Sequence, residues 1–235
     1  MRLAIMQPYF LPYLGYLALI KHSDFFVVFD TPQFIRHGWI ERNRILKPKE
    51  GWQYIKVPLE KHHSKTAIKD VKIKNSVDWQ KKIFAQLDHY KKKARYYSQV
   101  MALLEVVFSL QTDSIVKLDA FALEKIFEYL DIPFKYSIFS EMDLKIEEPQ
   151  APDEWALNIS KALGADEYIN LPGGENFFDR NKYEKEGIKL NFLKLNLQEY
   201  NQKREIFEPG LSIIDVLMFN SPETIRNLLH ELEYN

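Results

Sequence analysis

The chain has 235 residues, of which 46% are hydrophobic and 28% are charged, and its formal net charge is −1. This balance is typical of a globular protein with one sizeable core, so we expect a single domain over residues 1–235. The absence of cysteine excludes disulfides, thiolate metal sites and a cysteine nucleophile, and it fits a cytoplasmic location. We also expect neither a signal peptide nor a transmembrane segment, because every apolar run is far shorter than the ~20 residues that cross a bilayer.

The first 30 residues predict a β-strand, a loop, a helix and a second strand. Leu3–Met6 is a short apolar run, and a loop with two prolines leads from it into a short helix over Tyr13–Lys21. The β-branched and aromatic run Phe25–Phe29 then ends at Asp30. Strand, helix and strand within about 30 residues is the size of a βαβ unit, so we expect the two strands to be parallel.

Residues 36–75 predict a β-rich insertion. Trp39–Leu46 and Trp52–Leu59 flank a Pro- and Gly-containing turn and predict a hairpin, and the alternation over Ile68–Ile73 predicts a third strand. Residues 36–95 hold 17 Lys and Arg against 6 Asp and Glu, a surplus of 11 positive charges. So basic a segment suits an anionic ligand, although a solvated lysine-rich surface would give the same composition.

The remaining elements predict a helical segment over residues 76–131 followed by alternating strands and helices. The helices we expect run from Asn75 or Ser76 to Lys93 and over residues 97–110, 114–130, 153–163, 211–219 and 222–233. The strands we expect lie at residues 134–139, 167–171 and 188–193. The sequence therefore predicts an α/β fold with a Rossmann-like parallel sheet, an antiparallel insertion and a helical segment.

The loop after the first strand is the sharpest candidate for a binding site. It carries Gln7 and Tyr13 and leads into a helix that contains Gly15 and Tyr16. Ligands of open α/β sheets bind at the carboxyl ends of strands, and a helix N-terminus there offers unpaired N–H groups to phosphate. Gly15 would let a ligand or a neighbouring strand come close. The alternative is that the prolines and aromatic residues only shape a tight turn.

Asp30 and Gln33 follow the second strand at the same edge of the sheet. A carboxylate at Asp30 could bind a hydroxyl or an amine, or it could act as a catalytic base. An aspartate that merely caps the next turn is the alternative. If the two strands are neighbours, Asp30 lies beside the first loop.

The predicted hairpin carries the tripeptide Arg42-Asn43-Arg44. On a strand Arg42 and Arg44 share one face and Asn43 takes the other. Two guanidinium groups on one face can hold a phosphate or carboxylate, although a solvated pair bridged to Glu41 or Glu60 is the alternative.

His62 and His63 lie in a lysine-rich stretch after the hairpin. No His-x-His or His-Glu-x-x-His spacing completes a ligand set, so we assign no metal site. Exposure at the surface is the simpler interpretation. If either residue takes part in chemistry, His63 is a candidate base with a near-neutral pKa.

Two late segments add weaker signals. Gly173-Gly174 follows a predicted strand, and paired glycines can form a backbone nest for an anion, although simple turns use them too. Ser212 and Asp215 suit a helix cap and its first turn, with Asp215 as a candidate for an inward-facing carboxylate. We expect a cleft where loops 7–13, 30–38 and 172–176 converge.

The sequence as a whole resembles the WbqC-like family, which is associated with bacterial O-antigen and other surface-polysaccharide gene clusters. The motifs that carry the resemblance are Gln7 through Tyr16, Asp24 through Asp30 with Gln33, Trp39 through Arg44, Tyr168 through Gly174 and Phe207 through Leu217. The first 30 residues are also loosely similar to HIGH-motif nucleotidyltransferases. Tyr13 and Tyr16 stand at the places of the two histidines of that motif, so the likeness implies a nucleotide site but not the imidazoles.

Two functions are compatible with these observations. The first is a transferase that modifies a nucleotide-linked amino sugar by acyl or aminoacyl transfer, with Arg42 and Arg44 on the pyrophosphate and Asp30 or His63 as base. The second is a non-catalytic sugar-nucleotide or lipid-phosphate binding protein of a glycan assembly complex. We expect a small anionic ligand and no nucleic acid, because no nucleic-acid motif accompanies the basic run. The cofactor and the oligomeric state stay unassigned.

Overall fold

A computed structural model describes residues 1–195, 198–230 and 232–234 of the chain. Within these residues the main sheet has six strands in the order β5-β2-β1-β6-β7-β8. Their bounds are β1 (Arg2–Met6), β2 (Phe25–Val28), β5 (Tyr136–Ile138), β6 (Glu167–Asn170), β7 (Lys189–Leu195) and β8 (Leu232–Tyr234). The first five strands in this order are parallel to one another, and β8 pairs antiparallel with β7.

Strand β1 lies at the centre of the sheet. Leu3 is in register with Phe25 of β2 on one side and with Tyr168 of β6 on the other. Leu3, Ala4 and Ile5 are buried, as expected of a parallel strand that is covered on both faces. The prediction that the first two strands are parallel neighbours is therefore confirmed.

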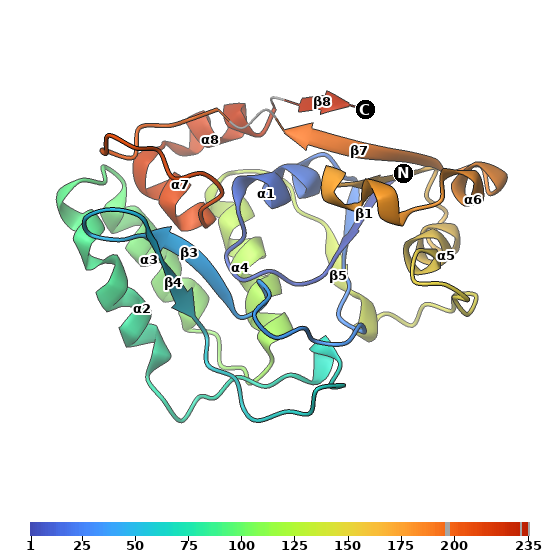
Figure 1. Cartoon of the computed structure of the whole chain (residues 1–235), viewed down its shortest axis with the longest axis horizontal. Coiled ribbons are helices and arrows are strands. Elements are labelled where there is room, and N and C mark those ends of the chain that lie inside the picture. The colour runs from blue at the N-terminus through green and yellow to red at the C-terminus, as the bar shows by residue number, and fades with distance from the viewer. Residues whose placement is uncertain (196–197, 231, 235) are drawn as a thin grey trace.

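Helices cover both faces of the sheet (Figure 1). Ala4, Phe26 and Val28 pack in one core with α1 (Leu14–Lys21), α3 (Tyr97–Phe108), α4 (Ile115–Tyr129) and α7 (Ile213–Phe219). Leu3, Ile5 and Val27 face a second core with α5 (Glu154–Ala162) and α6 (Arg180–Lys185). The helix after β1 and the helices flanking β6 thus lie on opposite faces, which makes the boundary between β1 and β6 the topological switch point of the sheet.

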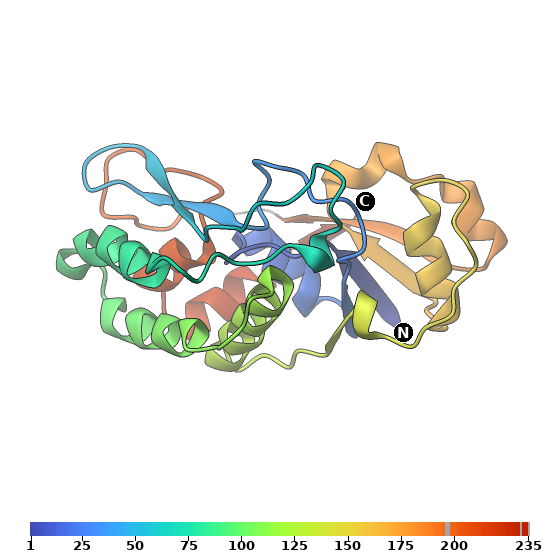
Figure 2. The same ribbon diagram turned by 90° about the horizontal axis from the view of Figure 1, so that it is seen from below.

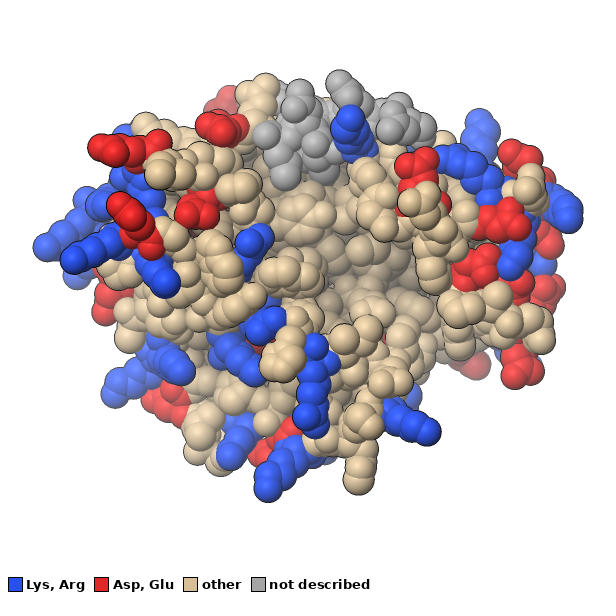
Figure 3. Space-filling model, viewed as in Figure 1, with Lys and Arg blue, Asp and Glu red and all other residues tan. Residues whose placement is uncertain are grey.

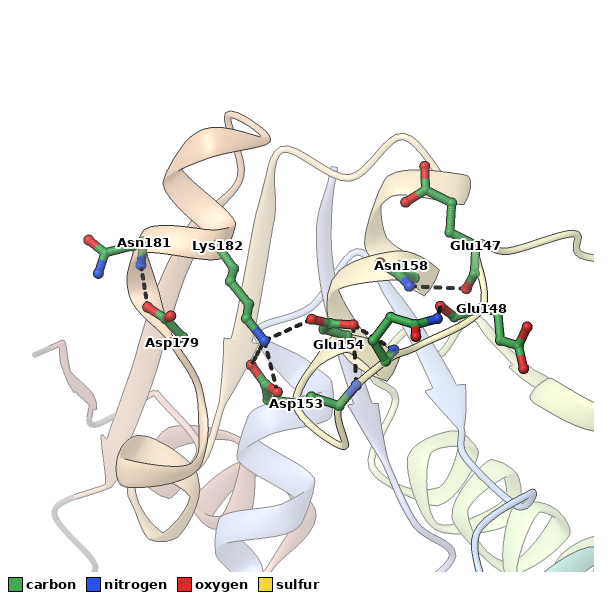
Figure 4. A network of polar contacts seen from close by, with 10 residues as sticks. Glu147, Glu148, Asp153, Glu154, Asn158, Asp179, Asn181 and Lys182 are labelled. Carbon is green, nitrogen blue, oxygen red and sulfur yellow. Dashed lines mark hydrogen bonds and ion pairs between the residues drawn. The ribbon is translucent and has the colours of Figure 1, made fainter.

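A charged network ties the two helices of the second face together (Figure 4). The Lys182 ammonium in α6 donates to Asp153 at 2.9 Å and to Glu154 at 2.8 Å, at the start of α5. Hydrogen bonds from this ammonium hold the pKa of the Glu154 carboxyl below its usual range. Helix α6, which the sequence analysis did not predict, therefore closes the face beside β6 and β7.

The basic insertion forms a separate two-stranded antiparallel sheet of β3 (Arg42–Leu46) and β4 (Trp52–Lys56). This confirms the hairpin, although β3 begins three residues later than predicted. The strand predicted over Ile68–Ile73 is wrong, because residues 68–70 form the 3-10 turn η1 (Ile68–Asp70). The backbone N–H groups of Ile68 and Lys69 donate instead to the carbonyl oxygens of Pro32 and Asp30, which fastens this segment to the end of β2.

The helical segment contains α2 (Trp79–Leu87), the 3-10 turn η2 (Asp88–Lys92), α3 and α4. Helix α2 begins later than expected and is capped by Asp78, whose carboxylate accepts from the Lys81 N–H, not by Asn75 or Ser76. Near the C-terminus, α8 (Pro222–Leu228) ends before the predicted limit of residue 233. Residues 232–234 pair with β7 instead, and residue 231 lies outside the described residues.

Candidate functional site

The candidate site lies at the carboxyl edge of the main sheet, the edge at which β1, β2, β5, β6 and β7 end. Loops 7–13, 30–38 and 171–178 leave three adjacent strands there, because β1 lies between β2 and β6. Figure 2 shows the β3-β4 hairpin and the segment after β6 on the side of the sheet away from the N-terminus. Figure 3 shows that this face is hollowed in the middle, where uncharged residues line it, with Lys and Arg gathered toward the hairpin and the helices beside it.

Three tyrosines pack against one another under the first loop. The Tyr16 ring is buried, and its hydroxyl donates to the Gln7 carbonyl at 2.7 Å. Tyr9 lies edge-on to Tyr16 and stacks on the Trp39 ring at 5.7 Å. Burial raises the pKa of Tyr9, Tyr13 and Tyr16, so all three hydroxyls stay protonated at neutral pH. The cluster is therefore neutral and shapes the loop that carries the exposed Gln7 side chain.

Asn43 fixes the first loop to the hairpin. Its buried amide nitrogen donates to the carbonyls of Phe10 at 3.1 Å and Leu11 at 2.7 Å, and its amide oxygen accepts from the Arg44 N–H. The amide is therefore fully occupied by the backbone. In the structure Asn43 positions the loop, a role that the sequence analysis did not assign to this candidate ligand-binding residue.

Arg42 and Arg44 lie on the opposite face of β3 from Asn43, as predicted. The Arg42 guanidinium donates to the carbonyls of Gly38 and His37 and lies 4.3 Å from the Tyr54 ring centroid. The Arg44 guanidinium lies between the rings of Trp39 and Trp52, at 5.4 Å and 5.2 Å from their centroids.

One nitrogen of Arg44, Nη2, donates to the Gly210 carbonyl at 3.0 Å, and the buried Nε has no hydrogen-bond partner among the described residues. The hydrogen bonds that the two guanidinium groups make within the described ranges all go to carbonyl oxygens, and neither group forms an ion pair there. Within the described part of the chain, both guanidinium groups are therefore held by neutral acceptors and aromatic rings and not by a carboxylate.

Asp30 is buried at the end of β2. Its carboxylate accepts from the Ser140 backbone N–H at 3.0 Å and from the Ser140 hydroxyl at 2.5 Å. Ser140 belongs to the 3-10 turn η3 (Phe139–Glu141), which directly follows β5. Asp30 thus joins the ends of two neighbouring strands, and it presents an exposed serine at the edge of the sheet.

The segment that carries His63 runs alongside the loop after β2. The Phe34 N–H donates to the Thr66 carbonyl at 2.9 Å, and the Gln33 side chain donates to the Ser64 carbonyl at 2.7 Å. The side chains of Gln33 and His63 are both exposed. The structure therefore brings Asp30, Gln33 and His63 onto adjoining segments of the same edge.

Gly173 and Gly174 lie in the 3-10 turn η4 (Pro172–Phe177), which follows β6. The Gly174 N–H is occupied by the Leu171 carbonyl at 3.1 Å. A Cβ at residue 174 would lie 3.1 Å from the Phe178 ring, whereas one at residue 173 would meet nothing. The space above Gly173 is therefore open at the switch point.

Two buried aspartates were predicted incompletely from the sequence. Asp119 was not singled out, and Asp215 was only a candidate for an inward-facing carboxylate. Asp119 is fully buried in α4, and neither of its carboxylate oxygens has a partner among the described residues. Burial, together with the nearby Glu41 charge, raises the pKa of Asp119 well above its ordinary value. The signal in the sequence was an aspartate on the apolar face of a helix, between Leu118 and Ala120.

Residues 198–212 lie against the hairpin, to which Arg204 donates at the Gly51 carbonyl, and Asp215 is buried. It accepts from Tyr200 at 2.5 Å, from Tyr90 at 2.6 Å and from Gln202 at 3.1 Å. The inward-facing carboxylate that the sequence analysis considered is thus present, and Ser212 caps α7 by accepting from the Ile214 N–H.

An open cavity lies outside the three candidate loops. It has a volume of about 330 Å³ and is lined by Arg180, Glu184 and residues 187–191. These residues precede and begin β7, whereas the candidate loops follow their strands. We give the switch-point loops more weight, because Arg180 is already bound to Glu175 and to the Leu190 carbonyl. No group of three or more His, Cys, Asp or Glu side chains in the described part of the chain could hold a metal ion.

The parallel sheet with helices on both faces defines a doubly wound α/β protein. Its candidate site lies at the carboxyl edge of the sheet, at the β1-β6 switch point. The chain belongs to the WbqC-like protein family, whose family model matches residues 7–227. It is also similar to the uncharacterized protein Rv1507c of Mycobacterium tuberculosis, with 27% identity over 224 residues that cover 93% of each chain. No solved structure matches the chain significantly. No helix in the described ranges has the length and apolar character to span a membrane.

Proposed function

We propose that the protein is a transferase that binds a nucleotide-linked amino sugar at the carboxyl edge of its sheet and places an acyl or aminoacyl group on the sugar's amino group. The process would be bacterial surface-polysaccharide biosynthesis, which the family resemblance implies. The observation that carries the proposal is the β1-β6 switch point, because ligands of doubly wound sheets bind in the crevice outside it.

Arg42 and Arg44 would hold the pyrophosphate. Both guanidinium groups donate to carbonyl oxygens and lie over aromatic rings, and neither forms an ion pair in the described chain. Charge-assisted hydrogen bonds to phosphate are about twice as strong as neutral ones, and bidentate guanidinium groups favour them. The neutral Tyr9, Tyr13 and Tyr16 cluster beside them adds no charge that would repel a phosphate.

The transfer step requires a base. The sugar's amino nitrogen attacks the acyl carbonyl carbon, a C–N bond forms, the bond to the leaving group breaks, and the nitrogen loses a proton. His63 is exposed and free to take that proton, whereas both Asp30 oxygens already accept from Ser140. We therefore assign the proton to His63 and give Asp30 the task of positioning Ser140 at the edge.

A non-catalytic binding protein for a sugar nucleotide or lipid phosphate is the second candidate. The observation that favours it is the engagement of both Asp30 oxygens with Ser140, which leaves the exposed His63 as the candidate base. In that case the Arg42 and Arg44 face would bind the phosphate, and no turnover would follow.

Titration calorimetry with nucleotide-linked amino sugars tests the binding step. Arg42→Ala and Arg44→Ala should each weaken binding by about 1.5–3 kcal/mol, the usual contribution of a charged hydrogen bond. Lys92→Ala, which removes one positive charge at the end of η2, is the matched control and should change the affinity little. Equal losses in all three variants would reduce the site to general charge attraction.

Turnover with an acyl or aminoacyl donor separates the two candidates. The transferase predicts that His63→Asn lowers the rate about 10²–10⁴-fold while sparing the affinity, the usual contribution of a general base. Tight binding without detectable product from any donor in the wild-type protein would leave the binding protein as the function.

A further inference from the structure

The two faces of the β3-β4 hairpin differ in what they carry. Arg44 lies directly opposite Tyr54 across the two strands, so both side chains leave the same face. The other face, with Ile45 and Ile55, is buried in the main core. Figure 2 shows α2 beneath the hairpin, and the Gln86 side chain of α2 donates to the Tyr54 carbonyl at 2.9 Å. The face with Arg44 and Tyr54 therefore points away from the core.

Aromatic rings connect this face to the first loop. Tyr9 in that loop stacks on Trp39 with the ring centroids 5.7 Å apart, and Trp39 lies 6.5 Å from Tyr54. Tyr54 in turn meets Trp52 edge-on at 5.0 Å. The two central rings reach solvent, because Trp39 is 38% exposed and Tyr54 is 37% exposed. These four residues thus form one connected surface that begins at the candidate site, which we call the aromatic platform.

Guanidinium groups alternate with the rings of the aromatic platform. The Arg42 guanidinium lies 4.3 Å from the Tyr54 centroid. The Arg44 guanidinium lies between Trp39 and Trp52, and its buried Nε has no partner among the described residues. A guanidinium group is planar and delocalised, so it stacks on ring systems while its N–H groups stay directed at phosphate. The platform therefore offers flat π surfaces and phosphate donors side by side.

The charge of the hairpin suits a phosphorylated ligand. Residues 39–56 hold 5 Lys and Arg against 2 Asp and Glu, a surplus of 3 positive charges. Of the two acids, Glu41 is buried and Glu50 lies in the turn between the strands. Glu208 of the segment 198–212 lies against the same turn. Arg42 is at the opposite end of the strands, so the acidic side chains near the hairpin leave it free to meet a phosphate.

We propose that the aromatic platform is the subsite for the nucleobase of the substrate. The base stacks on Trp39 and Tyr54. The diphosphate lies against Arg42 and Arg44, and the sugar extends along Tyr9 toward the first loop. Every base has a π face, which aromatic rings and guanidinium planes both bind.

This subsite rests on the proposed function and narrows it, because the carrier of the sugar is then a nucleotide and not a polyprenyl phosphate. A prenyl chain requires continuous apolar surface. The guanidinium groups that alternate with the rings here would lose their hydration beneath such a chain, which is costly. A stacked base, in contrast, leaves the N–H groups at the guanidinium edges available for phosphate.

Titration calorimetry with UDP, dTDP, CDP and GDP, each compared with inorganic pyrophosphate, measures the contribution of the base. At least one of these nucleotides should bind the wild type about 5- to 150-fold more tightly than pyrophosphate, the usual contribution of stacking one base. Tyr54→Leu keeps an apolar side chain beside Arg42 but has no π face. It should reduce the ratio of the two affinities at least about fivefold and leave the affinity for pyrophosphate unchanged.

Two further variants and one further ligand complete the experiment. Tyr54→Phe keeps the ring and should restore the ratio. Tyr97→Leu is the matched control, because this partly buried tyrosine lies on α3, outside the hairpin, and it should change neither affinity. Farnesyl diphosphate, which carries a prenyl chain in place of the nucleoside, should bind no more tightly than pyrophosphate.

Any of three results overturns the nucleobase subsite. They are equal affinities of the wild type for pyrophosphate and all four nucleotides, an unchanged ratio in Tyr54→Leu, or tighter binding of farnesyl diphosphate than of every nucleotide. The first two leave the proposed function in place if Arg42→Ala still weakens binding of the nucleotide-linked amino sugar. Absence of binding of every phosphorylated ligand, the sugar nucleotides included, would remove the proposed function and the subsite together.

Discussion

The Tyr13 ring occupies the space that a side chain at residue 15 would need. A Cβ built on Gly15 would lie 2.8 Å from the ring carbon Cζ of Tyr13 and 3.0 Å from its hydroxyl. Gly15 was expected to admit a ligand or a neighbouring strand, and the group that comes close in the structure is the residue at the helix N-terminus itself. The glycine therefore lets Tyr13 fold back over α1.

Gly15→Ala should destabilise the protein by about 1–3 kcal/mol, the usual cost of forcing an extra methyl into a packed site. The clash is with the Tyr13 ring, so the same substitution in a Tyr13→Ala background should cost much less. Urea unfolding of the two single variants and the double variant measures the coupling between them. Additive effects would show that something other than the Tyr13 ring requires the glycine.

Asn43→Ala should cost about 1–3 kcal/mol in unfolding free energy, because two buried carbonyl oxygens, of Phe10 and Leu11, lose their donor. Loosening of this loop should also expose Trp39 further, which shifts its fluorescence to longer wavelength. Asn181→Ala, at an exposed position, is the control and should stay within about 0.5 kcal/mol of the wild type. An Asn43→Ala protein as stable as the control would contradict this role.

Local patterns sufficed for the parts of the fold that depend on short-range order. The apolar runs Leu3–Met6 and Phe25–Phe29 and the proline loop between strand and helix predict the parallel pair, because burial on both faces demands continuous apolar residues. The face shared by Arg42 and Arg44 follows from the alternation of a strand. These features need no knowledge of distant contacts.

Features that depend on distant partners could not be predicted. The alternation over Ile68–Ile73 matches a strand, but the backbone N–H groups there are taken by Asp30 and Pro32, and no sequence pattern announces those partners. The role of Asn43 depends on carbonyls more than 30 residues away. Likewise, the engagement of Asp30 depends on Ser140, 110 residues further along the chain.

Asp119→Asn should stabilise the protein at neutral and higher pH. Burial first and the Glu41 charge second raise the pKa of Asp119, so the folded chain holds a proton that the unfolded chain releases. Stability from this group is fully present below the unfolded pKa of about 4 and is lost as the pH rises through the folded pKa. Asparagine carries no such charge, so the advantage of the variant should grow with pH. Parallel stability curves of the two proteins from pH 5 to 9 would contradict it.

Asp215 should give the protein a pH-dependent stability in a defined window. Burial raises the pKa of Asp215 to about 6, although the donors Tyr200, Tyr90 and Gln202 act in the opposite direction. The folded state therefore binds a proton more tightly than the unfolded chain, whose aspartate titrates near 4. The stabilisation is complete below about pH 4 and falls by about 3 kcal/mol as the pH rises through 6.

Asp215→Asn removes that titration and also one charged acceptor, so the variant should be less stable than the wild type at pH 4. Above pH 6 the wild type loses its proton inside the core, and the gap between the two proteins should narrow by about 3 kcal/mol. Urea unfolding of both proteins at steps from pH 4 to 7.5 measures the gap, and the carboxyl carbon shift of Asp215 by NMR gives its pKa directly. A constant gap, or a carboxyl that titrates near pH 4, would mean that the three donors outweigh burial and that Asp215 is ionised throughout this range.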